Sequence, residues 1–157
     1  MKKTNSLSRR RVFWALLLVL IVVAVFLYRS RPGKEVPPHL RTVRIVHIRD
    51  GDTVEYPGKK AVRYLGIDTP ETGQPGADSA AAFNAALVLD REVGMEVGRD
   101  SLDRYDRELA WVFVDGRMVN LEMLKAGWAW CYFFDGNMKY SDQMIRAVRL
   151  AMNNRCG

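Results

Sequence analysis

Three short apolar segments joined by two tight turns limit most strongly the folds open to this chain. They span residues 42–48, 53–56 and 61–67, with Asp50-Gly51 in the first gap and Pro57-Gly58 in the second. Asp-Gly is a strong hairpin signal, because glycine takes positive φ without penalty and aspartate tolerates it. The pattern predicts strands joined by tight turns and argues against a doubly wound sheet, in which helices follow most strands.

The rest of the chain adds two strands and several helices to this start. Further strands are expected at 95–98 and 108–114, and an aromatic extended segment at 128–134. Five short strands with one helix among them and another at the end predict an α+β, mainly β domain. We expect a five-stranded Greek-key barrel of the OB-fold type with flanking helices.

The helices have recognisable ends in the sequence. Residues 76–94 have helix-forming composition with Gly94 as the stop, and a short helix over 118–127 is expected to start at an Asn120 cap. Residues 141–154 form an amphipathic pattern. The apolar side of this last helix is expected to carry Met144, Ile145, Val148 and Met152.

An unbroken apolar run from Val12 to Tyr28, flanked by arginines, precedes the domain. As a helix it is roughly 25 Å long, near the lower limit for a bilayer core, and Trp14 and Tyr28 extend it. We expect an uncleaved membrane anchor over 12–28 after a basic segment 1–11. A cleaved signal peptide and a twin-arginine export signal are the alternatives.

The charge distribution favours a non-cytoplasmic domain. Five basic residues precede the apolar run and three follow it closely, which favours an N-terminus inside and the domain outside, periplasmic or extracellular, or secreted if the segment is cleaved. A linker over 29–40 leads into the domain, residues 41–157. Residues 1–34 hold eight basic and no acidic side chains, leaving 16 basic and 18 acidic residues, a net of −2, so bulk charge does not indicate nucleic-acid binding.

Carboxylates converge at one end of the predicted hairpin. If strands 53–56 and 61–67 pair, Asp52 at the start of one lies opposite Asp68 at the end of the other. Strand alternation places Arg63 and Asp68 on opposite faces, unless a bulge intervenes. Two adjacent carboxylates need a shared proton or a cation, and a hard ion such as Ca²⁺ suits oxygen ligands better than Zn²⁺. The alternative is that Asp68 caps the following turn and Asp52 is solvated.

Two arginines give the same region an anion-binding character. Arg63 lies within an apolar strand, and Arg107 lies in the charged stretch "DSLDRYDRELAW". Planar guanidiniums suit phosphate oxygens, although such a charged stretch is more often a solvated loop.

Three motifs together carry a family resemblance. The segments "RDGDTV", "VRYLGIDTPET" and "DRYDRELAWVFVDGRMVN" resemble, in this order and spacing, the staphylococcal nuclease (thermonuclease) family over about residues 42 to 155. The resemblance implies an OB-fold enzyme that hydrolyses phosphodiester bonds of DNA and RNA with Ca²⁺.

The resemblance also assigns roles to individual residues. It implies that Asp52, Asp68 and the Thr69 carbonyl bind Ca²⁺, with Asp50 in the outer shell. It implies that Glu71 is the general base or positions the water, that Arg63 and Arg107 contact the scissile phosphate, and that Tyr105 contacts a nucleotide. Asp106 departs from the family, which usually has glycine there; Asp106 either pairs with Arg107 or points to solvent.

Two further expectations concern the C-terminal part. The aromatic residues of 128–134 are expected to be mainly core, with Tyr132 alone chosen as a base-stacking residue. Cys131 and Cys156, the only cysteines, either form a disulfide or remain two thiols.

We therefore expect a Ca²⁺-dependent nuclease, membrane-anchored or exported, with a monomeric catalytic domain and no evident protein partner. The alternative is a catalytically silent OB-fold module that binds nucleic acid or protein. The joint presence of Asp52, Asp68, Glu71, Arg63 and Arg107 favours the enzyme.

Overall fold

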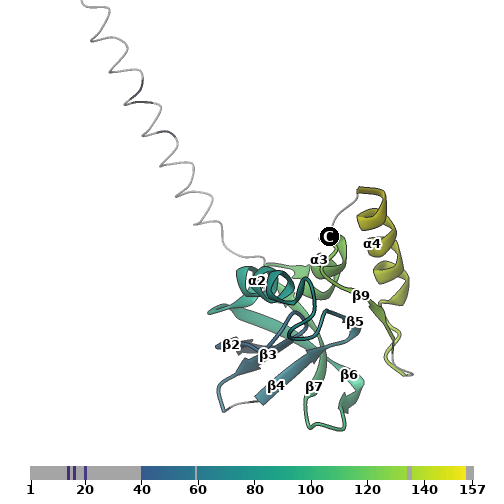
Figure 1. The fold of residues 1–157 in the computed structure, drawn as a ribbon. Helices are drawn as coiled ribbons and strands as arrows, with labels where there is room; N and C mark the ends of the chain where they lie inside the picture. The colour runs from purple at the N-terminus through teal and green to yellow at the C-terminus, as the bar shows by residue number, and fades with distance from the viewer. Residues whose placement is uncertain are drawn as a thin grey trace, which may run out of the picture. The chain divides into compact units, whose positions relative to one another are not determined.

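The computed structural model describes residues 40–58, 60–133 and 136–154, together with Trp14, Leu16 and Leu20. The chain divides into two units, Met1–Gly33 and Lys34–Gly157. The strands and helices described below belong to the second unit (Figure 1). The expected anchor over 12–28 lies outside the described residues except at those three positions, and the expected linker does so except at Leu40. Within the described part of the chain, no helix has the length and apolar character needed to cross a membrane.

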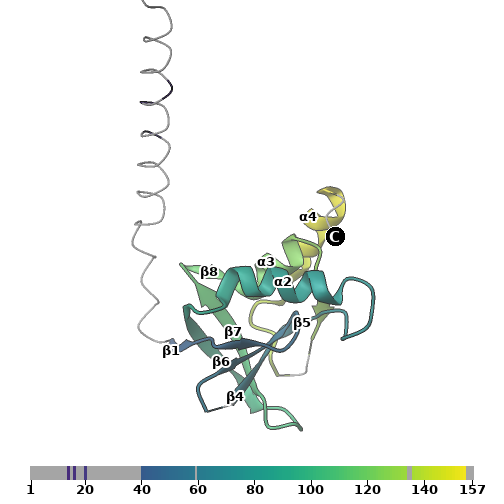
Figure 2. The ribbon, with the colours of Figure 1, turned by 60° about the vertical axis from the view of Figure 1, so that its left-hand side comes forward.

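The domain is mixed α+β and mainly strand. Its strands are β1 Arg41–Arg44, β2 His47–Ile48, β3 Thr53–Tyr56, β4 Lys60–Tyr64, β5 Gly66–Asp68, β6 Glu92–Leu102, β7 Glu108–Val114, β8 Arg117–Met118 and β9 Trp130–Tyr132. Its helices are α2 Ala77–Val88, α3 Val119–Lys125 and α4 Ser141–Asn154. Helices α2 and α3 lie over one end of the curled sheet, with α4 beside α3 (Figures 1 and 2).

The main sheet is curled, and its two edge strands are consecutive in the chain. Its order is β1-β6-β7-β4-β3-β2, with β8 added to β7, so β1 and β2 lie at opposite ends of the path. Only Ile45 and Val46 separate these strands along the chain. Ile45 exchanges backbone hydrogen bonds with Arg91 and Asp90, and Val46 donates to Glu55. The resulting curled sheet fits the expected OB-type architecture.

Two of the expected strands are broken, so the expected count of five is wrong for this sheet. The segment 42–48 divides into β1 and β2 as the sheet curls. The segment 61–67 divides at Leu65, and β4 pairs in parallel with β7 while β5 pairs with β9. Gly66 permits the change with φ +78, and a Cβ there would lie 2.3 Å from the Met144 sulfur.

The break also changes which side chains meet. Strand alternation assigned Arg63 and Asp68 to opposite faces, yet their side chains form an ion pair of 2.7 Å. The turn of the backbone at Gly66 interrupts the alternation between them. The prediction of opposite faces was therefore wrong.

Helix boundaries differ from expectation at two places. Helix α2 ends at Val88, because Leu89 is extended and Asp90 has φ 59, so the expected stop Gly94 lies instead within β6. Helix α3 has Met118 at its N-cap. Asn120 is no cap: its buried side chain donates to the Leu65 carbonyl at 2.8 Å and accepts from the Val112 amide at 3.0 Å.

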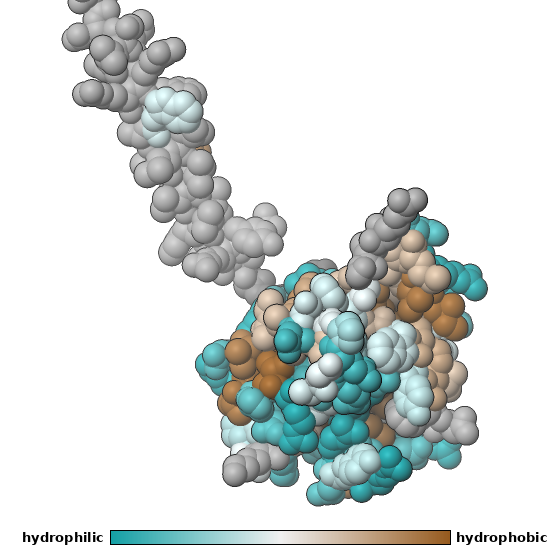
Figure 3. All heavy atoms as spheres, viewed as in Figure 1, coloured by the Kyte–Doolittle hydropathy of each residue, from teal (hydrophilic) through white to brown (hydrophobic). Residues whose placement is uncertain are grey.

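Helix α4 has the expected bounds but a different packed face. Met144 is buried as expected, and Val148 packs against the core. Ile145 and Met152 are 39% and 73% exposed, and the buried positions are instead Ala147 and Ala151. Figure 3 shows hydrophobic side chains over α4 on this face of the domain, and hydrophilic ones gathered toward the β6–β7 turn.

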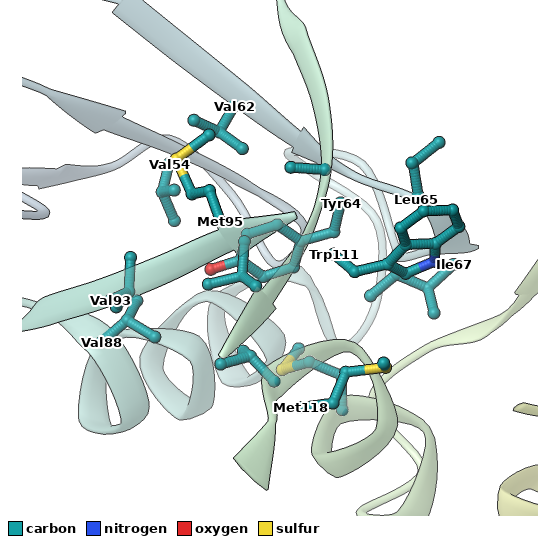
Figure 4. Packing of buried hydrophobic residues seen from close by; sticks show 14 of the residues in the cluster. Val54, Val62, Tyr64, Leu65, Ile67, Val88, Val93, Met95, Trp111 and Met118 are labelled. Atoms are coloured by element: carbon teal, nitrogen blue, oxygen red, sulfur yellow. The ribbon is translucent and has the colours of Figure 1, made fainter. Parts of the chain in front are cut away.

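The core lies between the curled sheet and the helices. Figure 4 shows side chains of β3, β4, β5, β6 and β7 meeting those of α2 and β8. The labelled residues are Val54, Val62, Tyr64, Leu65, Ile67, Val88, Val93, Met95, Trp111 and Met118. Each fully buried aliphatic side chain stabilises the fold by about 1.5–3 kcal/mol, which fixes the strand ends that carry the polar residues described next.

Candidate functional site

The β2–β3 turn directs Asp52 into the domain. The Asp52 amide donates to Asp50 Oδ1 at 3.0 Å, an interaction typical of an Asx turn. Gly51 is needed for a reason other than the expected positive φ, which it does not have. A Cβ at Gly51 would lie 2.7 Å from Thr69 Oγ1 and 2.9 Å from the Ala80 Cβ. The glycine therefore allows the turn to pack against the segment after β5.

Arg63 holds the two predicted metal-binding carboxylates together. Its Nη2 donates to Asp68 Oδ1 at 2.7 Å, and its Nε lies 3.1 Å from Asp52 Oδ1. Its Nη1 donates to the carbonyls of Tyr64 and Ile67 at 2.8 and 2.7 Å. Because Nε and Nη2 form one edge of the guanidinium, Asp52 and Asp68 are side by side along that edge.

Asp52 is buried, which rules out the alternative that it is solvated. Its side chain accepts from Thr53 Oγ1 at 3.0 Å and from Thr69 Oγ1 at 3.2 Å, and the residue is 4% exposed. Burial raises the pKa of Asp52 to about 7, and the charges of Asp50 and Asp68 add to this, while Arg63 opposes it. One guanidinium thus incompletely offsets the negative charge collected here.

A hydrogen-bond chain from helix α2 fixes the same turn. Asn84 Nδ2 donates to the Asp50 carbonyl at 3.2 Å, and Asn84 Oδ1 accepts from the Tyr64 hydroxyl at 3.0 Å. Tyr64 and Asn84 are both fully buried. Helix α2 and strand β4 therefore position the acidic turn through a side chain that the sequence did not single out.

Arg107 is positioned by Asp103 and not by Asp106. Its Nε donates to Asp103 Oδ2 at 2.7 Å, and the amides of Arg107 and Tyr105 donate to Asp103 Oδ1 at 3.0 and 2.9 Å. Asp106 is exposed with φ 61, a conformation that suits glycine. Among the described residues no ion pair involves Asp106, so Arg107 keeps its outer Nη edge for other partners.

Tyr105 and Glu71 stand at the rim of the site. Tyr105 is 63% exposed, and the guanidinium carbons of Arg104 and Arg107 lie 4.8 and 5.4 Å from its ring centroid. Glu71 is exposed, and its amide donates to Gln74 Oε1 at 2.9 Å. Within the described segments, no hydrogen bond or ion pair engages the Glu71 carboxylate.

A cleft of about 770 Å³ brings most of the predicted site residues together. Thr69 lies behind its wall and contributes the hydrogen bond to Asp52. The predicted residues that line the cleft are Asp50, Asp52, Arg63, Asp68, Glu71, Tyr105, Arg107 and Tyr132. Tyr132 is 48% exposed, and its neighbour Trp130 is 46% exposed, against the expectation that Trp130 belongs to the core.

Sequence reasoning missed several residues of the cleft. Asp103 had a usable signal, because an aspartate two residues before Tyr105 and four before Arg107 can accept from both amides. Asn137 had none: its side chain is buried and accepts from the Arg99 amide at 2.7 Å, a contact between distant segments. The other lining residues missed are Asp100, Leu102, Arg104 and Leu109.

The possible disulfide between Cys131 and Cys156 falls partly outside the described residues. Cys131 is half-buried, and burial raises the pKa of its thiol. Cys156 is not among the described residues, so the pairing stays a prediction.

Known proteins resemble the chain over most of its length. A family model described as "Staphylococcal nuclease homologue" matches residues 61–157. The chain is 42% identical over 133 residues to endonuclease YncB of Bacillus subtilis, covering 74% of this chain and 63% of that protein, slightly less than two thirds of its length. It is 30% identical over 152 residues to thermonuclease of Staphylococcus hyicus, covering 85% and 90%. Thermonuclease of Staphylococcus intermedius is 32% identical, with coverage of 89% and 91%.

Proposed function

Because this chain belongs to the family of staphylococcal nuclease homologues, as its motifs indicated, we propose that it is a nuclease that hydrolyses phosphodiester bonds of nucleic acids. The observation that carries the proposal is the pair Asp52 and Asp68 on one edge of Arg63, inside a cleft that Arg107 and Glu71 also line. Carboxylates for a cation, guanidiniums for phosphate and a further carboxylate for water are the groups that this reaction requires.

We propose that the nuclease depends on Ca²⁺. The donor set fits a hard cation, since oxygen ligands predominate and two carboxylates converge on one small volume. Asp52 and Asp68, with the Thr69 carbonyl, would hold the ion, which when bound supplies positive charge beside the scissile phosphate. Within the described part of the chain, no group of three or more His, Cys, Asp or Glu side chains is arranged as a metal site. The proposal therefore rests on the two carboxylates and the family.

The two arginines have different capacities to bind phosphate. Arg63 is 6% exposed and is engaged by four protein oxygens. Over the residues that the structure describes, Arg107 makes one short side-chain hydrogen bond, from Nε to Asp103 Oδ2. Its Nη1 makes a long contact of 3.5 Å with Thr53 Oγ1. Arg107 thus presents donors to a phosphate, whereas Arg63 mainly holds the carboxylates in place.

We propose that Glu71 acts on water. Its exposed carboxylate lines the cleft three residues after Asp68, so a water between Glu71 and a bound phosphate is accessible to it. As a general base or positioning group, Glu71 would orient the attacking oxygen and accept its proton.

The test is cleavage of single-stranded DNA and of RNA by the full chain in detergent, with Ca²⁺ or with excess chelator. We expect cleavage only with Ca²⁺, and a loss on the order of 10² to 10³ in kcat for Glu71→Gln. Glu122→Gln on α3, a partly buried glutamate outside the cleft, is the matched control and should cleave normally. A folded, Ca²⁺-binding chain that cleaves neither substrate would overturn the nuclease and support the silent binding module.

We further propose that residues 12–28 anchor a monomeric enzyme whose domain lies on the non-cytoplasmic side, periplasmic or extracellular. The 17-residue apolar run and the excess of basic residues before it support this. Protease added to intact cells, or to cells with a permeabilised outer layer, should then remove the domain while a cytoplasmic marker survives. Recovery of the intact domain in the cytosolic fraction would contradict the proposal. Light scattering of the purified chain would test the monomer.

A further inference from the structure

We propose that a second groove, separated from the cleft by Tyr105 and Arg107, holds the stretch of a single nucleic-acid strand next to the cleaved bond. This inference rests on the proposed function. The groove has a volume of about 520 Å³, enough for a ligand of nucleotide size, and Arg49, Lys60 and Asp106 are among the residues that line it beside Tyr105 and Arg107.

The two hollows share a wall. Leu102, Tyr105 and Arg107 line both of them. Leu102 is 52% exposed and Tyr105 is 63% exposed, so this wall offers an apolar and aromatic surface on either side. A strand leaving the cleft meets the ring of Tyr105, on which a base can stack, before it enters the second groove.

The charge of the second groove is opposite to that of the cleft. The cleft is lined by six carboxylates, those of Asp50, Asp52, Asp68, Glu71, Asp100 and Asp103, against three guanidiniums. The second groove is lined by Arg49, Lys60 and Arg107 against Asp106 and Glu108. The Glu108 carboxylate already accepts hydrogen bonds from Arg41 and Tyr56. The groove therefore attracts phosphate without a metal, whereas the cleft does not.

Lys60 is the cation best placed to bind a phosphate there. It is exposed at the start of β4, opposite Tyr56 in the β3–β4 hairpin. Arg49 forms an ion pair with Glu55, and Arg107 forms one with Asp103. Lys60 forms no ion pair with any described residue, although its charge helps to lower the pKa of Glu108, so no direct ion pair has to break before its ammonium binds a phosphate oxygen.

The experiment compares a single-stranded DNA 12-mer with a dinucleotide as substrates of the full chain in Ca²⁺. For Lys60→Ala we expect KM for the 12-mer to rise about fivefold, with kcat and both dinucleotide constants unchanged. The dependence of log KM on log salt should weaken by about 0.7, as expected for one lost phosphate contact on a single strand. Asp106→Asn, which keeps a residue that tolerates positive φ, should lower KM for the 12-mer.

Lys125→Ala is the matched control, because Lys125 is an exposed lysine on α3 that lines neither hollow. Equal effects of Lys60→Ala on both substrates, or an effect no larger than that of Lys125→Ala, would overturn the inference. The affinity for a labelled 12-mer, measured by fluorescence anisotropy in chelator, separates the groove from the chemistry. If the wild-type chain cleaves nothing, the nuclease proposal fails; weaker 12-mer binding by Lys60→Ala then still supports the groove, and unchanged binding overturns it.

Discussion

At the scale of single residues, Arg63 connects the stability of the domain with the chemistry of the cleft. It is a buried cation that contacts two carboxylates and two backbone carbonyls. Removing one member of such a group leaves a buried charge without compensation, which usually costs 3–5 kcal/mol. Arg107 is more exposed and has one firm side-chain partner, Asp103. Substitution of Arg63 should therefore mainly lower stability, whereas substitution of Arg107 should mainly lower activity.

We predict that Arg63→Ala lowers the free energy of unfolding in chelator by about 3 kcal/mol or more, because Asp52 loses its counter-charge. Arg107→Ala should change it by less than about 1 kcal/mol while lowering kcat on the order of 10² to 10³. Urea denaturation and cleavage rates measure the two effects. Added Ca²⁺ should restore more stability to Arg63→Ala than to the wild type. Equal destabilisation by both substitutions would refute the distinction.

The sequence could predict most of the site at this scale, because its residues follow strand ends and turns. The approach of Asp52 to Asp68 came from hairpin pairing, and the positions of Arg63 and Arg107 from motifs. Neither singled out the partner of Arg107, although the spacing of Asp103 from Tyr105 and Arg107 was a usable signal. Asn137 was beyond prediction, because its contact with Arg99 joins segments 38 residues apart.

At the scale of elements, helix α2 reaches the acidic turn through Asn84. The buried amide bonds the Asp50 carbonyl and the Tyr64 hydroxyl, so it joins the helix, the turn and strand β4. Residues that orient metal ligands commonly change metal affinity 10- to 100-fold when removed. Asn84 is therefore a positioning residue for the proposed cation.

We predict that Asn84→Ala raises the Ca²⁺ concentration for half-maximal cleavage at least 10-fold, with little change in kcat at saturating Ca²⁺. Tyr64→Phe is the control, because it removes the hydroxyl but leaves the Asn84 bond to Asp50. It should cost about 1 kcal/mol of stability and alter the Ca²⁺ dependence much less. If Asn84→Ala lowers stability and leaves the Ca²⁺ dependence unchanged, Asn84 has only a structural role.

Glu108 on β7 joins three strands in a pH-dependent way. It accepts from Tyr56 of β3 at 3.0 Å and from Arg41 of β1 at 3.2 Å. Burial raises the pKa of Glu108, but these hydrogen bonds and the Arg41 charge outweigh burial and hold the pKa below 4.5. The stabilisation is therefore present above the unfolded-state pKa and is lost as pH falls through the folded-state pKa.

We predict that Glu108→Gln destabilises the domain at pH 7 and that the difference from the wild type shrinks as pH falls below about 4.5. A neutral Glu108 and a glutamine make similar interactions, which is why the difference disappears. Urea denaturation in chelator across this range measures it. A difference independent of pH would show that the carboxylate charge is not involved.

Elements were predicted well where their signals are local. The 108–114 and 53–56 strands and the 141–154 helix have the expected bounds. The failures arise from tertiary contacts. Segment 61–67 divides at Leu65, because β4 pairs with β7 whereas β5 pairs with β9. Asn120 enters the core instead of capping α3. Gly66 and Asn120 lie where the sequence indicated a change of structure, but their roles depend on tertiary contacts that the sequence does not show.

At the scale of the molecule, the curled sheet depends on the segment from β1 to β2, which supplies both of its edge strands. The region that matches the family model, residues 61–157, lacks β1, β2, β3 and Asp52. A sheet without these strands exposes unpaired backbone along β6, which has lost β1, and along β4, which has lost β3.

We predict that a chain of residues 61–157 shows no cooperative thermal transition by circular dichroism and elutes as aggregates, because its sheet has two open edges. A chain beginning at residue 35, which keeps these three strands, is the control and should unfold cooperatively. A cooperative, monomeric 61–157 would show that the sheet is stable without its edge strands.

The joining segment also imposes an order on events during translation. Strand β2 pairs with β3, which follows it by a few residues, whereas Arg41 of β1 pairs with Met95, 54 residues later. At about 5–20 residues per second, a ribosome needs roughly 3 to 11 s to make the stretch that β1 requires. Strand β1 of the nascent domain therefore stays unpaired until β6 has been made. The hairpin of β3 and β4 can form well before the sheet closes.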